Sequence, residues 1–136
     1  MTVNKDVQGF GVPWEDSYGY VQAVKVGSTI YMSGQLGHDE QGNLVGSGSL
    51  EENMEMQMRQ TYVNAKKILS RYGATLDNVV EEVVYVTDMD AAFAVAGPVR
   101  KEAYGTEKPA VASTIFTTPC LAFPAQLIEI KFVARI

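Results

Sequence analysis

The sequence contains few of the side chains that usually perform acid–base, nucleophilic or metal chemistry. Its 136 residues include one histidine, His38, and one cysteine, Cys120. A catalytic metal held by two histidines is therefore excluded, and a structural zinc site lacks soft ligands. No histidine or cationic pattern adjoins Cys120, so we expect a structural or surface thiol. His38 follows a predicted strand, and it either lines a cleft or lies exposed in the loop.

The charge balance argues against nucleic acid as the principal partner. Lys and Arg number 11 against 16 Asp and Glu, which gives a net charge of −5, and no basic block offers a phosphate-binding stripe.

The composition is that of one folded domain in a soluble protein. Hydrophobic residues make up 46% of the chain and charged residues 20%, as in ordinary globular proteins. No apolar run reaches the roughly 18 residues that span a bilayer, and the first ten residues lack a signal-peptide pattern. We expect a single domain over residues 1–136 with a flexible segment at 1–15, no membrane contact, and a cytoplasmic location.

The first half of the chain predicts a hairpin followed by a long helix. Two β-rich runs, 18–26 and 29–32, are separated by the turn residues Gly27 and Ser28, which predicts a tight hairpin. Ser49 and Glu52 form a capping box, and apolar residues then recur at the helical period as far as Gly73.

The second half predicts a strand, a helix and two more strands. The run 78–87, with valines around two acidic residues, predicts a strand that has one solvated position or a solvated end. A helix should follow Asp88, broken at Gly97-Pro98 and ending near 104–105. Residues 111–117 and 126–136 predict strands, and the last alternates apolar with largely charged residues.

The element order β-β-α-β-α-β-β indicates an α+β fold. The simplest layered arrangement is a mixed sheet with both helices on one face. The other face then needs cover, and in so small a domain another subunit usually supplies it.

The chain resembles the Rid family, also called YjgF/YER057c/UK114 or the reactive-intermediate deaminases. The matching residues occur in family order over the whole chain beyond about residue 15, a more specific signal than any single motif. They are Tyr20-Val21-Gln22-Ala23-Val24, Gly27, Ile30 to Gln35, Gly42-Asn43-Leu44, Gln57 to Gln60, Asn64, Gly73, Val84 to Asp88, Lys108-Pro109-Ala110 and Ile128-Glu129-Ile130.

The resemblance implies a chorismate-mutase-like fold and a homotrimer with small-molecule clefts at its subunit interfaces. In deaminating members, an enamine or imine such as 2-aminoacrylate is hydrolysed to a 2-keto acid and ammonia. The family needs neither a metal nor an organic cofactor, so we expect none here.

The resemblance also implies site residues. Glu129 matches the glutamate that positions or activates the attacking water, and desolvation at an interface can raise the pKa of such a carboxylate. Tyr20 matches the site tyrosine, and Ser33 and Gly34 match the segment that contacts the ligand. On pattern alone, Glu129 would instead be a solvated strand carboxylate, Tyr20 an interface aromatic and Ser33 a turn residue.

One departure from the family pattern bears on the substrate. Deaminating members place an arginine after the Pro-Ala pair to clamp the substrate carboxylate, and here that position is Val111. Ser113 stands where the family pattern has a cysteine. A larger or less anionic substrate would be favoured by the side chains of Val111, Phe116 and Trp14. Trp14 either caps the cleft or packs as an ordinary aromatic.

Another cation could replace the missing arginine. The nearest in sequence are Arg100, Lys101 and Lys108, although such positions are usually solvated helix-surface charges. His38 is a further alternative.

Two classes of function follow from these residues. One is hydrolysis of a reactive enamine or imine that lacks the usual small carboxylate or carries it elsewhere. The other is a trimer that binds a metabolite without turning it over. Endoribonuclease activity is the weakest alternative, because a net charge of −5 opposes phosphate binding.

Overall fold

The structure is a computed structural model that describes residues 2–136, and it contains a six-stranded sheet. Strand β6 (Ile128–Arg135) lies inside this sheet, between β3 (Thr29–Met32) and β4 (Val79–Val86). The strand order is β1-β2-β3-β6-β4-β5. The alternation predicted for the last strand is confirmed, because Ile128, Ile130, Phe132 and Ala134 are fully buried while the intervening residues are not. One face of β6 therefore builds the core, and the other carries Glu129.

The remaining strands continue this sheet on both sides of β6. β1 (Asp6–Gln8), β2 (Ala23–Val26) and β3 (Thr29–Met32) pair antiparallel, and the predicted turn joins β2 to β3 with Gly27 at φ +58°. β4 (Val79–Val86) is antiparallel to β6 and parallel to β5 (Ala112–Thr117).

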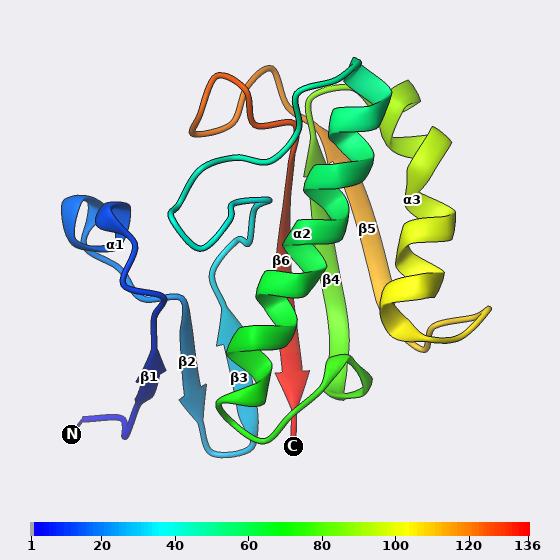
Figure 1. The fold of residues 1–136 in the computed structure, drawn as a ribbon. Coiled ribbons are helices and arrows are strands. Elements are labelled where there is room, and N and C mark those ends of the chain that lie inside the picture. Colours follow the sequence, from blue (N-terminus) through cyan, green and yellow to red (C-terminus); the bar gives the residue numbers. More distant parts are fainter. Residues whose placement is uncertain (1) are drawn as a thin grey trace.

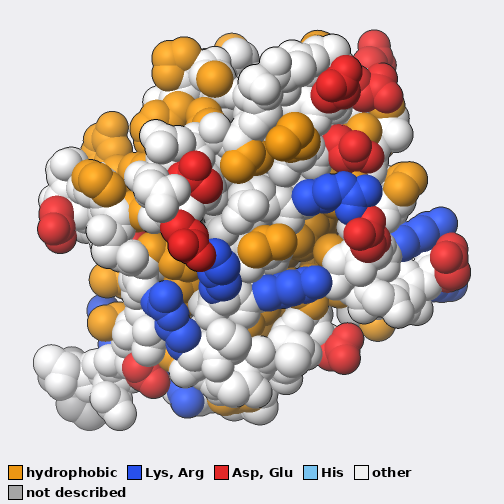
Figure 2. Space-filling model, viewed as in Figure 1, with side chains coloured by type: hydrophobic (Ala, Val, Ile, Leu, Met, Phe, Trp, Pro, Cys, Tyr) orange, Lys and Arg blue, Asp and Glu red, His pale blue; other side chains and the backbone are white. Residues whose placement is uncertain are grey.

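Two long helices cover one face of the sheet, as predicted (Figure 1). α2 (Leu50–Ser70) begins at the predicted cap, where the Ser49 hydroxyl accepts a hydrogen bond from the Glu52 N–H. α3 (Met89–Tyr104) connects the parallel strands β4 and β5. Charged side chains of both signs are interspersed on the outer surface of this layer (Figure 2). The core lies between the helices and the sheet.

α3 is continuous, so the predicted break at Gly97-Pro98 is wrong. Pro98 lacks an N–H and removes one helical hydrogen bond, but Pro98 itself is exposed. The helix is held elsewhere: Asp88 caps its first turn by accepting from the Ala91 N–H, and Val95 and Val99 are buried in the core.

Three short elements were not predicted. They are β1, the helix α1 (Pro13–Tyr18) and the 3-10 turn η1 (Leu76–Asn78). α1 ends at Tyr18, the first residue of the run 18–26 that was predicted to be a strand, and the observed strand β2 begins only at Ala23. Pro13 favours the first turn of a helix, and Gly19 ends it in the left-handed conformation at φ +78°.

The face of the sheet opposite the helices is open and carries apolar side chains. Tyr31 is 50% exposed and lies opposite Val133 across the β3–β6 pair, and Phe116 is 53% exposed at the β5 edge. We call this surface the open face; its other apolar members include Val24, Val83 and Tyr85. Within residues 2–136, no helix has the length and apolar content needed to cross a membrane.

Candidate functional site

Four of the predicted site residues lie together in one cleft. Tyr20, Ser33, Gly34 and Glu129 line a cavity of about 220 Å³. The other lining residues come from α1, the segment after β3 and the loop before β6; they are Trp14, Tyr18, Leu36, Ala122 and Phe123. Of these, only Trp14 had been considered as a site residue from the sequence. We call this cavity the Glu129 cleft.

Glu129 is fixed at the cleft by its neighbours on both sides. A Cβ atom on Gly34 would overlap the Glu129 side chain, so glycine is what allows the carboxylate to lie there. The Gln126 amide donates to Glu129 Oε1 at 3.2 Å and to the Ile128 carbonyl at 3.2 Å. These contacts hold a proton acceptor at a defined position in the cleft.

Tyr20 and Ser33 supply hydroxyl groups near this carboxylate. The Ser33 hydroxyl donates to the Val21 carbonyl at 2.6 Å, which orients its lone pairs. Burial raises the pKa of the Tyr20 phenol, and the charges of Glu15 and Glu129 add to this effect. Tyr20 therefore stays protonated at neutral pH and can donate a hydrogen bond to a ligand.

Trp14 forms an aromatic wall of the cleft. Its ring makes an edge contact with Phe123 at 5.4 Å between centroids and with His38 at 5.2 Å. Trp14 Nε1 is buried and has no hydrogen-bond partner among residues 2–136. Trp14 thus lines the cleft, which was one of the two predicted alternatives.

Buried amides position α1, and with it Trp14, against the sheet. Gln22 donates to Glu15 Oε2 at 2.9 Å, and Gln35 donates to Gln22 Oε1 at 2.9 Å. Glu15 also accepts from the backbone N–H groups of Phe10 and Gly11. Sequence reasoning missed this support because isolated Glu and Gln residues carry no periodic signal.

Val111, Ser113 and Phe116 do not line the Glu129 cleft in this chain. Val111 packs against the core. Phe116 stacks on Tyr85 with centroids 6.1 Å apart, and Tyr85 is in register with Glu129 across the β4–β6 pair. All three lie on β5 or directly before it, at the end of the strand order opposite to β1.

The two acidic residues of β4 differ: Glu81 is exposed, in line with one solvated position in this strand, and Glu82 is buried beneath the helices. Its side chain is 0% exposed and accepts hydrogen bonds from Tyr62, Tyr104 and Ser113 at 2.9 to 3.0 Å. Arg100 completes this group, with its guanidinium 3.2 Å from Glu82 Oε2 and 3.3 Å from the Ser113 hydroxyl.

Arg100 is therefore a partly buried ion-pair partner instead of a solvated helix charge. Burial alone would lower the pKa of its guanidinium, but the charges and hydrogen bonds of Glu82 and Tyr62 together raise the pKa. Burial and the charge of Glu82 also raise the pKa of the Tyr62 and Tyr104 phenols. Arg100, which contacts Ser113, is thereby neutralised by Glu82.

His38 is neither exposed nor part of the Glu129 cleft lining. It is 4% exposed and lies behind Trp14. Within residues 2–136, no group of three or more His, Cys, Asp and Glu side chains is close enough to hold a metal ion.

Comparison with known proteins finds one family. The family described as endoribonuclease L-PSP matches residues 15–136. A RutC family protein from Pyrococcus abyssi is 36% identical over 91 residues, covering 67% of this chain and 68% of that protein. A 2-iminobutanoate/2-iminopropanoate deaminase from Capra hircus is 38% identical over 95 residues, covering 69% of this chain and 65% of that protein.

Solved structures agree over nearly the whole chain. A putative endoribonuclease from Thermotoga maritima is 29% identical with a TM-score of 0.75, covering 100% of this chain and 97% of that one. A YjgF/YER057c/UK114 protein from Mycobacterium tuberculosis is 25% identical with a TM-score of 0.80, covering 98% and 100%.

Proposed function

Because this chain belongs to the endoribonuclease L-PSP family, which includes the YjgF/YER057c/UK114 or Rid proteins, we propose that it hydrolyses a small reactive enamine or imine to a carbonyl compound and ammonia. The observation that carries the proposal is the Glu129 carboxylate held over Gly34 in a cleft that also contains Tyr20 and Ser33. Relatives described as imine deaminases support the same chemistry.

The residues of the cleft match the needs of this hydrolysis. Water adds to the carbon of the C=N bond, Glu129 accepts the proton that the water loses, and the nitrogen gains a proton. The carbinolamine then loses ammonia, and its hydroxyl proton leaves as the carbonyl forms. Tyr20 can donate a hydrogen bond to the nitrogen or the developing hydroxyl, and an enamine must first take a proton at carbon to become the imine.

The lining of the cleft bears on the substrate. Glu129 is the only charged residue among those that line it, while Trp14, Leu36 and Phe123 provide apolar surface. Val111 stands at the family's arginine position, and Arg100 is paired with Glu82. We therefore propose a substrate with an apolar substituent whose recognition does not depend on a small carboxylate.

We propose that the active form is a homotrimer with the cleft at each subunit interface. The exposed apolar side chains of the open face, which lie beside Lys131 and Arg135 of β6, support an assembly that covers this face, because exposed apolar surface marks interaction sites. In such an assembly a neighbouring β5 could bring Val111, Ser113 and Phe116 to the Glu129 cleft.

The proposed activity is tested by following keto or aldehyde product from imines generated in situ. The panel contains 2-aminoacrylate, 2-iminobutyrate and imines with branched or aromatic substituents. We expect hydrolysis above the buffer rate for at least the bulkier imines, loss of this rate in Glu129→Gln, and no loss in Glu55→Gln, which changes a carboxylate on the outer surface of α2. Rates equal to buffer for every imine would refute the proposal.

The absence of a cation among the cleft's lining residues also favours a second candidate, a trimer that binds a metabolite without hydrolysing it. Ligands that raise the melting temperature but release no ammonia would support it. Endoribonuclease activity is disfavoured by the net charge of −5 and would require RNA cleavage that survives stringent purification and disappears in Glu129→Gln.

A further inference from the structure

A second cavity lies on the other side of His38 and Trp14 from the Glu129 cleft. It has a volume of about 270 Å³ and is lined by Phe10, Val12, His38, Asp39, Glu40, Asn64, Lys67 and Arg71. We call it the α2 pocket. We propose that it binds a small carboxylic acid that has an apolar side chain and a hydroxyl or amino group at C2.

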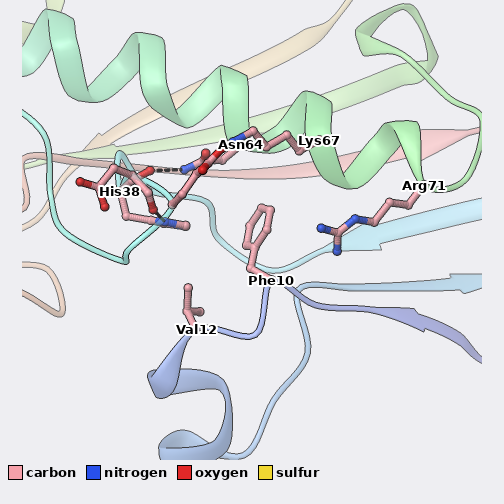
Figure 3. Close-up of a pocket in the computed structure, with 8 residues that line it drawn as sticks. Phe10, Val12, His38, Asn64, Lys67 and Arg71 are labelled. Carbon is pink, nitrogen blue, oxygen red and sulfur yellow. Dashed lines mark hydrogen bonds and ion pairs between the residues drawn. The ribbon is translucent and has the colours of Figure 1, made fainter.

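The pocket is assembled from three separate parts of the chain. α2 contributes Asn64 and Lys67, and Arg71, the C-cap residue directly after the helix, continues the same face because the three are spaced three and four residues apart. Phe10 and Val12, from the segment between β1 and α1, lie opposite them, and His38 lies at the end away from Arg71 (Figure 3).

Lys67 and Arg71 provide positive charge for a carboxylate. Among the described residues, Lys67 pairs only with Glu40, whose Oε1 lies at 3.7 Å, and the Glu40 side chain is 81% exposed. Such surface pairs contribute little free energy, so a ligand carboxylate can replace Glu40. Arg71 donates to the Gly9 carbonyl and pairs with no carboxylate among residues 2–136. A guanidinium has five N–H donors, so Arg71 keeps donors for a ligand.

Two of the remaining polar residues are already occupied within the fold. Asp39 Oδ1 accepts from the backbone N–H groups of Gln41 and Asn43, which shapes the loop. Asn64 donates to the carbonyls of Leu36 and His38 and accepts from Gln60. Neither side chain needs a ligand, so recognition falls to the two cations and His38.

His38 defines the group expected next to the carboxylate. Its Nδ1 lies 2.8 Å from the Asp39 carbonyl, which can only accept, so Nδ1 carries the proton of the neutral ring. Nε2 has no hydrogen-bond partner among the described residues 2–136 and is therefore available to accept. A hydroxyl or amino group on the ligand would donate to it.

The opposite wall is apolar and accounts for the side chain of the proposed ligand. Val12 is 7% exposed, and the Phe10 ring lies between His38, with centroids 5.3 Å apart, and the Arg71 guanidinium, 5.5 Å from the ring centroid. Inorganic phosphate would satisfy the cations but leave this wall without a partner. The combination favours a C2-substituted carboxylate with a branched aliphatic side chain.

The fluorescence of Trp14 can report binding in this pocket. Trp14 is the only tryptophan, and its ring contacts His38. We expect 2-hydroxy-4-methylpentanoate to change the fluorescence of Trp14 in the full chain, with calorimetry giving the same dissociation constant. The neutral 4-methylpentanamide and inorganic phosphate should bind at least tenfold more weakly, and 4-methylpentanoate, which lacks the C2 donor, should lie between.

Matched variants locate the binding. Lys67→Gln should weaken binding about tenfold, as for the loss of one charge-assisted hydrogen bond, while Lys66→Gln on the neighbouring face should change it less than twofold. Three results would overturn the proposal: no binding of the hydroxy acid, equal effects of the two lysine variants, or binding that is lost in Glu129→Gln but kept in Lys67→Gln. The last result would place the acid in the Glu129 cleft.

Discussion

Gly34 shows how one residue without a side chain can define a site. The Glu129 carboxylate and its Cγ atom occupy the space that any larger residue would need at position 34. Ser33 on one side and Gln35 on the other are held by hydrogen bonds to Val21 and Gln22, so the backbone cannot easily move aside. The position of Glu129 therefore depends on this glycine.

Gly34→Ala should displace Glu129 and reduce imine hydrolysis. A shift of about 1 Å in a catalytic group can cost about a hundredfold in rate, and we expect a loss of that order. The measurement is product formation by the full chain under saturating substrate. Gly97→Ala is the matched control, because a Cβ there meets no atom within 4 Å. An unchanged rate in Gly34→Ala would show that Glu129 does not need its observed position.

Tyr62 should make the free energy of unfolding depend on pH in the alkaline range. Burial and the charge of Glu82 raise the pKa of its phenol in the folded protein above the unfolded value of about 10. The folded state then holds a proton that the unfolded state releases, so this contribution is complete below pH 10 and is lost as pH rises further. Above pH 10, Tyr62 should make the free energy of unfolding fall by up to about 1.4 kcal/mol per pH unit.

Urea unfolding at pH 9 to 11 measures this slope. Tyr62→Phe should flatten it, while Tyr18→Phe, at a position that is 74% exposed, should leave it unchanged. Equal slopes in wild type and Tyr62→Phe would contradict the assignment.

At the scale of elements, the Glu82 cluster joins four of them. Glu82 is on β4, Tyr62 on α2, Arg100 and Tyr104 on α3, and Ser113 on β5. α3 is thereby fixed over the parallel pair β4–β5 by polar contacts as well as by apolar packing. Its attachment should be sensitive to the loss of a single charge.

Arg100→Leu should lower the free energy of unfolding by about 3 to 5 kcal/mol, because it leaves a buried carboxylate without its cation. Chemical denaturation at neutral pH measures this. Lys101→Leu, at the next and more exposed position, should change stability by less than about 0.5 kcal/mol. Adding Glu82→Gln to Arg100→Leu should restore part of the loss; an additive loss would show that the two side chains are not coupled.

The elements that could be predicted from the sequence are those with long periodic patterns. α2 and β6 bury one regular face each, and the β2–β3 hairpin has a two-residue turn, so local residues determine them. β1 and α1 are too short to show a period. The burial of Glu82 was not predictable because its four partners lie 18 to 31 residues away along the chain.

The candidate site also contains residues that could be predicted from the sequence and residues that could not. Tyr20, Ser33, Gly34 and Glu129 could be placed by their resemblance to a family pattern, and the structure brings them together. Tyr18, Leu36 and Phe123 could not, because they belong to an unpredicted helix and to loops whose path depends on tertiary contacts. The same holds for the α2 pocket, where three distant segments meet.

At the scale of the whole molecule, the helices cover only one face of the sheet. The open face places Tyr31, Val133 and Phe116 in contact with solvent in the isolated chain. Two of these side chains are at least half exposed, which is costly for apolar groups of this size. The homotrimer that we propose would remove this cost.

Tyr31→Lys should dissociate that trimer. Sedimentation equilibrium of the wild-type chain should give three times the 14.9 kDa monomer mass, and the variant should shift toward the monomer because each copy adds a charge to the covered surface. Phe93→Lys is the control, since Phe93 is 67% exposed on α3, on the helix side. A wild-type monomer, or an intact trimer in Tyr31→Lys, would contradict the proposed use of this face.

Strand β5 gives the isolated subunit a further liability. It pairs only with β4, and its six residues, Ala112–Thr117, contain no charge and no proline. Charges and prolines are the features that normally keep an edge strand from adding further strands. A free subunit therefore presents a template for edge-to-edge aggregation, and we expect conditions that dissociate the protein to produce β-rich aggregates nucleated at this strand. The proposed trimer would then also protect the protein from aggregation at this strand.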